Sequence, residues 1–120
     1  MKIFFTLLLL FFISINSYSQ TDCDQLPTTF SSYNQALNLV SNANFSFIDN
    51  VNTSRSTVIQ GAKYFSCDNR SGFLIIGVNN QRYIYQGVPI NVWNNFKTAS
   101  SFGSFYNSYI KNNYQLRLAR

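Results

Sequence analysis

The side chains that most often carry acid–base and metal chemistry are scarce in this chain of 120 residues. Histidine and glutamate are absent, and only four aspartates supply negative charge. Without histidine no Ser/His/Asp or Cys/His set can form, and no acid cluster offers the oxygen shell that a hard cation needs. No glycine-rich phosphate loop follows a predicted strand. The sequence therefore predicts no catalytic residues, no metal and no cofactor, and it favours a non-enzymatic protein that binds a partner.

Two tyrosines form the first candidate binding site. Tyr83 and Tyr85 lie two residues apart in a predicted strand, so their side chains point to the same side of the sheet. An exposed aromatic pair of this kind can stack nucleic-acid bases. The alternative is that both rings pack under a following helix, because a small core needs that face. Their hydroxyls could then still reach the surface.

A second candidate site lies at residues 100–104, where a helix is predicted to begin. Ser101 can cap this helix, and Gly103 would let a ligand approach free backbone N–H groups, which bind anions at helix N-termini. Lys97 precedes this turn and Asn107 follows it, so both could contact the same ligand. The alternative is an ordinary N-cap whose glycine lets two helices pass closely.

These candidates depend on a predicted run of strands. The turn after the first strand contains Asp68, which is expected to cap local backbone amides. Asn79 and Asn80 can supply the left-handed conformations of a tight turn before the last strand. A three-stranded antiparallel meander is the simplest interpretation. The predicted strands cover residues 57–65, 73–78 and 82–85.

Two short helices are predicted after the meander. The first begins near Pro89 and places Trp93 and Phe96 on its apolar face, where Trp93 is expected to join the core. The second begins after Ser100 or Ser101. Both must cover one face of the sheet, because three bare strands cannot bury enough apolar area. The predicted fold class is α+β: a three-stranded antiparallel β-meander followed by two short helices.

An N-terminal helical extension, residues 20–54, precedes the meander. Ser32 and Gln35 fit a Ser-x-x-Gln capping box, and apolar residues follow at helical spacing until about Asn42. The later polar stretch, Asn50 to Ser56, is either a linker or a short strand that leads into the first predicted strand.

Residues 1–19 have the pattern of an export signal. Lys2 precedes an apolar run from Ile3 to Ile13, and the small residues Ser17 and Ser19 fit a cleavage site. The run of about eleven residues is short against the roughly twenty that span a bilayer, so a signal peptide is favoured over a retained anchor. No second apolar run appears. The mature chain is therefore predicted to be secreted or periplasmic, without a membrane span.

Export would place Cys23 and Cys67 in an oxidising compartment. An even number of cysteines there favours a disulfide. Their separation of 44 positions resembles neither a redox Cys-x-x-Cys motif nor a zinc site. Two free, buried thiols are the alternative.

Charge is unevenly distributed along the predicted mature chain. Residues 20–54 contain three aspartates and no cation, whereas residues 55–120 contain eight Lys or Arg and one aspartate. Such asymmetry can mark a surface for an anionic partner, either an envelope polymer, an acidic protein or nucleic acid. The alternative is that the scattered cations serve solubility alone.

One ordered set of residues carries a family resemblance. Its centre is the Tyr-x-Tyr of Tyr83 and Tyr85, and it extends from Ser56 to Tyr114. With these residues, this half of the chain resembles the KTSC domain, a module of some lysyl-tRNA synthetases that also occurs alone in bacterial proteins. The other matching residues are Ile59, Tyr64, Val88, Pro89, Ala99, Ser101, Gly103, Phe105, Asn107 and Ile110.

The resemblance implies a KTSC-like domain over residues 55–118, after the signal peptide and the extension. The family has no established activity, and nucleic-acid binding has been suggested for it from the synthetase context, which is missing here. The extension and the turn that holds Cys67 lie outside the family pattern, which indicates a secreted variant. The sequence thus predicts a small exported, non-enzymatic binding module of unknown ligand, with nucleic-acid binding as the alternative.

Overall fold

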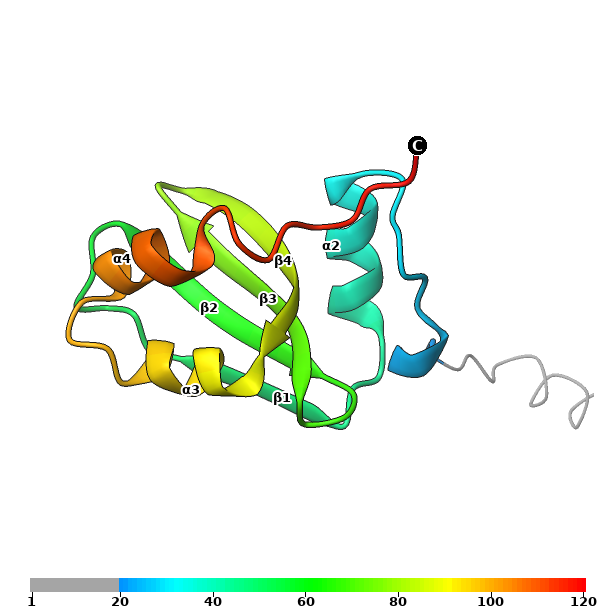
Figure 1. The fold of residues 1–120 in the computed structure, drawn as a ribbon, viewed down its shortest axis with the longest axis horizontal. Coiled ribbons are helices and arrows are strands. Elements are labelled where there is room, and N and C mark those ends of the chain that lie inside the picture. The colour runs from blue at the N-terminus through cyan, green and yellow to red at the C-terminus, as the bar shows by residue number, and fades with distance from the viewer. Residues whose placement is uncertain (1–19) are drawn as a thin grey trace, which may run out of the picture.

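A computed structural model describes residues 20–120, and the predicted signal peptide lies outside the described residues. Within them, none of the helices has the length and apolar character to cross a membrane. Figure 1 shows a sheet between two groups of helices. In chain order the elements are η1 (Cys23–Gln25), α2 (Tyr33–Asn42), β1 (Phe47–Val51), β2 (Ile59–Ser66), β3 (Ser71–Val78), β4 (Gln81–Pro89), α3 (Ile90–Lys97), α4 (Phe102–Phe105) and the π-helical turn η2 (Tyr106–Ile110).

The sheet is an antiparallel meander of four strands in the order β1-β2-β3-β4, one strand more than the three predicted. The additional strand is β1, an edge strand in which Asp49 lies opposite Tyr64 and Asn50 lies opposite Lys63. Its side chains alternate between partly buried and exposed. An edge strand pairs through its backbone, so it tolerates the polar side chains that also fit a linker. The α+β class is confirmed.

The turns between strands follow from local chemistry. Asn79 and Asn80 have φ angles of 51° and 67°, which confirms the left-handed turn predicted between β3 and β4. Asp68 Oδ1 accepts hydrogen bonds from the backbone N–H groups of Arg70 and Ser71, so this carboxylate caps its turn as predicted. These two hydrogen bonds hold the pKa of Asp68 below its ordinary value.

The start of α2 confirms the predicted capping box with one difference. Ser32 Oγ accepts a hydrogen bond from the Gln35 N–H at 3.0 Å, whereas Gln35 Oε1 accepts from the N–H of Ser31 at 2.7 Å. Two backbone donors at the helix N-terminus are thereby satisfied. Ala36 and Val40 are then buried on the face that α2 turns toward the sheet.

Helices cover both faces of the sheet (Figure 1), and each face has its own apolar cluster. α3, α4 and η2 cover one face, as predicted for the two C-terminal helices, and α2 covers the other. The first cluster includes Tyr64, Leu74, Ile76, Tyr85, Trp93, Phe96, Phe102, Tyr106 and Ile110. The second consists of Phe30, Ala36, Val40, Phe65, Ile75, Ile84 and Leu116.

The N-terminal and C-terminal segments are joined to the sheet. Cys23 and Cys67 form a disulfide with a Cα–Cα distance of 5.8 Å, which is typical of such bonds. The backbone N–H of Phe30 donates to the carbonyl of Arg117, and the N–H of Ala119 donates back to the Phe30 carbonyl. Because residues 20–54 also supply β1 and α2, they share one sheet and one apolar cluster with the rest of the chain.

Candidate functional site

The two predicted stacking tyrosines have different environments. Tyr85 is 7% exposed and packs edge-on against Tyr106, with which its hydroxyl also shares a hydrogen bond. Burial raises the pKa of Tyr85 far above its ordinary value. Tyr83 is 39% exposed and donates its hydroxyl to Gln81 Oε1 at 2.7 Å. Only one ring is therefore open to solvent, and the pair presents no two-ring stacking surface.

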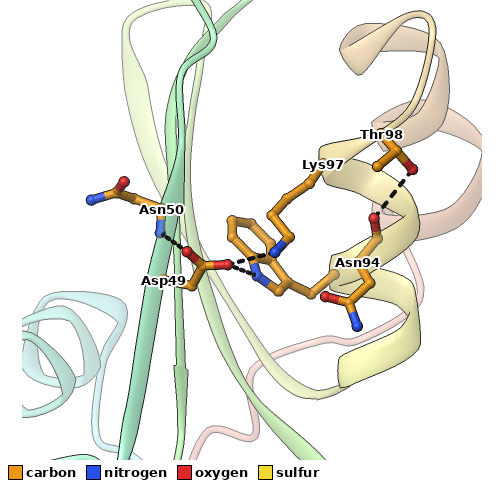
Figure 2. A network of polar contacts seen from close by, with 6 residues as sticks. Asp49, Asn50, Asn94, Lys97 and Thr98 are labelled. Atoms are coloured by element: carbon orange, nitrogen blue, oxygen red, sulfur yellow. Dashed lines mark hydrogen bonds and ion pairs between the residues drawn. The ribbon is translucent and has the colours of Figure 1, made fainter.

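Lys97 is bound within the fold. Its Nζ lies 2.6 Å from Oδ2 of Asp49, and the same oxygen accepts the indole N–H of Trp93 at 2.9 Å. Figure 2 shows Asp49 pointing from β1 toward α3, where these two donors lie. Trp93 is fully buried, as predicted, and its ring stacks on Tyr64 with centroids 5.4 Å apart. The carboxylate in the acidic extension thus neutralises the cation that was a candidate anion ligand.

The pKa of Asp49 is lowered chiefly by the Lys97 hydrogen bond, with a smaller contribution from Trp93. We therefore expect Asp49→Asn to reduce the free energy of unfolding at neutral pH by about 1 kcal/mol, a modest value because the ion pair is partly exposed. A folded-state pKa below the ordinary value of about 3.9 gives stability that is present above that pH. It is lost as pH falls through the lowered pKa. Urea unfolding at several pH values, followed by Trp93 fluorescence, measures both effects.

Asp24→Asn is a matched control, because it removes the same charge from the exposed turn η1. It should leave stability nearly unchanged at neutral pH. Equal losses in the two variants, or a difference that persists unchanged in strong acid, would show that the Asp49 carboxylate does not bind α3 as described.

The residues predicted around the start of α4 do not converge on one ligand position. Ser101 Oγ caps the helix by accepting the Ser104 N–H at 3.2 Å. A Cβ atom on Gly103 would meet no heavy atom within 4 Å, so this glycine is not required for close helix packing. Ser101 and Gly103 together line one small hollow, but Lys97 points to Asp49 and the exposed Asn107 lies outside that hollow.

Arg55 has a structural role that was not predicted from the sequence. Its guanidinium donates to the carbonyl oxygens of Ala99 and Ser100 and lies 3.8 Å from the centroid of the Phe102 ring. A cation is favourable near the C-terminal end of α3, where free carbonyls gather. The guanidinium also gains from the aromatic face. Arg55 thereby fixes the turn between α3 and α4.

A groove of about 750 Å³ lies where α3, α4 and η2 meet. Its lining contains serines, asparagines and aromatic rings, and no Lys, Arg or Asp contributes to it. Ser101 is the one predicted site residue in this lining. The lining residues are Val92, Asn95, Ala99, Ser100, Ser101, Ser104, Phe105, Ser108, Tyr109, Asn113 and Tyr114.

A smaller hollow of about 330 Å³ lies over the sheet, and its lining includes Lys63 and Arg82. Lys63 lies opposite Ile75, and Arg82 lies two residues before Ile84. Since Ile75 and Ile84 both belong to the α2-side cluster, the two cations are on that face, beyond the part of the sheet that α2 covers. No aspartate lines the hollow, and Lys97–Asp49 is the one ion pair within residues 20–120.

Fold and surface together define a small, disulfide-bonded α+β domain in which a sheet carries helices on both faces. The KTSC domain model matches residues 56–114, so the chain contains a KTSC domain over this segment. The matched segment runs from just before β2 to just beyond η2, so β1 and α2 lie outside it. Neither the curated proteins nor the solved structures contain a match to the chain. Among residues 20–120, no three Cys or Asp side chains gather where they could hold a metal ion.

Proposed function

We propose that this protein is an exported, non-catalytic binding module that holds an anionic envelope polymer on the basic hollow formed around Lys63 and Arg82. The observation that carries the proposal is the placement of these two cations at one hollow without an acidic neighbour. A polymer with repeated negative charges can contact both at once, and it gains from release of its counterions.

The floor of the hollow supports this proposal. Gly77 lies opposite Arg82 and contributes no side chain to the lining of the hollow. A Cβ at Gly77 would lie 2.3 Å from the carbonyl oxygen of Gln60, so glycine is required for the close pairing of β2 and β3. Asn50 adds an amide group to the lining, which can donate hydrogen bonds to phosphate or carboxylate oxygens, whereas the Gln60 amide donates to the Thr57 carbonyl and accepts from the Asn80 N–H.

Nucleic acid is the less favoured partner. Single-stranded DNA and RNA are bound through aromatic platforms as well as charge, and Tyr85 is buried while Tyr83 alone is exposed. An envelope polymer needs no stacking surface, so the basic hollow suffices for it.

Binding of polyphosphate and of a single-stranded oligonucleotide at low salt tests the partner class. We expect polyphosphate to bind and Lys63→Gln/Arg82→Gln to weaken it about ten-fold, because two phosphate contacts are lost. Lys111→Gln/Arg120→Gln is the matched control, since it removes the same charge from exposed residues outside the hollow. Equal weakening in both double variants, or no binding at low salt, contradicts the proposal. Tighter oligonucleotide binding that Tyr83→Ala weakens would replace it with nucleic-acid binding.

Export is tested separately by expressing the full chain in a bacterium and determining the N-terminus of the accumulated protein. We expect a protein that begins at Gln20 and is recovered from the periplasm or medium, in accord with the signal pattern of residues 1–19. A full-length chain retained in the cytoplasm would contradict export.

A further inference from the structure

We infer that the groove between α3, α4 and η2 binds an uncharged oligosaccharide. This groove is separate from the basic hollow, because the two share no lining residue. Its volume of about 750 Å³ falls in the range of small-ligand sites. The inference therefore does not depend on the proposed anionic partner.

Aromatic rings form one part of the groove lining. Tyr109 is 58% exposed and its ring packs against Phe105 with centroids 4.7 Å apart. Tyr114 is half-buried at the same groove. A pyranose ring has an apolar face of C–H groups, and an exposed aromatic ring with a supported orientation gives that face a flat contact surface.

Uncharged polar groups form another part of the groove lining. Asn95, Ser104 and Ser108 line the groove, and within residues 20–120 the structure gives their side chains no intramolecular hydrogen bond. Hydroxyl and amide groups both donate and accept, which suits the hydroxyls of a sugar. Ser104 and Ser108 are four residues apart, so they lie on one side of the last helical segment.

The absence of charged side chains from the groove lining favours an uncharged ligand over an anionic one. No Lys, Arg or Asp lines the groove, and Arg55, the cation at the neighbouring turn, is bound to the carbonyls of Ala99 and Ser100. An anionic ligand would lose hydration here without gaining a counter-charge. A ligand rich in neutral hydroxyls can exchange its water hydrogen bonds for those of serine and asparagine.

Titration of the purified protein with maltotriose, cellotriose and chitotriose tests the inference, with backbone amide NMR as the readout. At about 1 mM we expect at least one of these probes to shift the resonances of Ser104, Ser108 and Tyr109. The affinity should be insensitive to added salt, because no ion pair forms. It should also be unchanged in Lys63→Gln/Arg82→Gln, so failure at the groove is distinguishable from failure of the anionic-partner proposal.

Tyr109→Ala should weaken the bound probe about ten-fold, since the exposed ring is the contact surface. Tyr33→Ala is the matched control, because Tyr33 is 49% exposed and lies on α2, away from the groove. Absence of shifts with all three probes, or equal weakening by both tyrosine variants, would overturn the inference. Binding of the anionic probe trigalacturonate in place of the three neutral probes would also overturn it, because the ligand would then be charged. Self-association that Tyr109→Ala abolishes would overturn it too, because a second copy of the chain would then occupy the groove.

Discussion

Removal of the Cys23–Cys67 disulfide is expected to lower the free energy of unfolding by about 4 kcal/mol. The bond closes a loop with a sequence separation of 44, and in the chain-entropy model a loop of this length restricts the unfolded chain by that amount. A domain of this size has only a modest total stability. Loss of the bond therefore removes a large share of it.

The folded geometry gives the bond a second consequence. Cys67 follows the end of β2, and Ser46 Oγ, just before β1, donates to its carbonyl at 2.8 Å. The N–H of Cys23 donates to the carbonyl of Asn44. The first hydrogen bond joins the extension to the end of β2, and the second joins two parts of the extension to each other. Both remain after reduction, so the reduced protein is expected to fold in mild conditions while it unfolds at lower denaturant concentration.

Guanidinium unfolding of Cys23→Ser/Cys67→Ser, compared with the oxidised protein, measures this effect. Dithiothreitol should lower the midpoint of the oxidised protein to nearly that of the double variant, and should not change the double variant itself. A loss below about 1 kcal/mol would mean that the disulfide restricts the unfolded chain far less than the loop model requires.

Much of the sheet followed from local sequence. Asn79 and Asn80 predicted their turn because few residues tolerate left-handed backbone, and the continuous apolar run of β3 fits a strand buried on both faces. A short strand was one of two open alternatives for residues 50–56, but β1 begins earlier and covers Phe47–Val51. Its pattern of Phe47, Asp49 and Val51 facing inward includes a carboxylate whose partners, on α3, are distant in sequence. Its burial therefore could not be predicted locally.

The candidate site was less predictable for the same reason. Lys97 was predicted as an anion ligand, but in the structure it is paired with Asp49. This ion pair could not be predicted from local sequence, because Asp49 lies 48 residues earlier. Arg55 is likewise fixed by carbonyls 44 and 45 residues away. The groove did leave a signal: Ser100, Ser104 and Ser108 recur every four residues, opposite the apolar stripe of the last helical segment. The common side of these serines could thus be predicted from their spacing, whereas the groove that the serines line depends on tertiary packing.

Phe30→Ala is expected to reduce the free energy of unfolding by about 3–5 kcal/mol, the usual cost of deleting a fully buried aromatic ring. Phe30 is 0% exposed, and its ring meets Phe73 edge-on with centroids 6.0 Å apart. Its backbone also bridges to Leu118. Phe30 thus joins the extension to the sheet through its ring and to the C-terminal segment through its backbone, and its ring shares a buried cluster with Leu116.

Urea unfolding followed by circular dichroism and by Trp93 fluorescence distinguishes an integral extension from a loosely docked one. Trp93 lies in the cluster on the opposite face of the sheet, so coincident transitions that both shift in Phe30→Ala indicate one cooperative unit. Tyr33→Ala, at 49% exposure, should change stability by no more than about 0.5 kcal/mol. If Phe30→Ala instead leaves the Trp93 transition unchanged, the α2 side unfolds independently. In that case the face of the sheet covered by α3, which lies in the matched family segment (residues 56–114), would stay folded after α2 has unfolded.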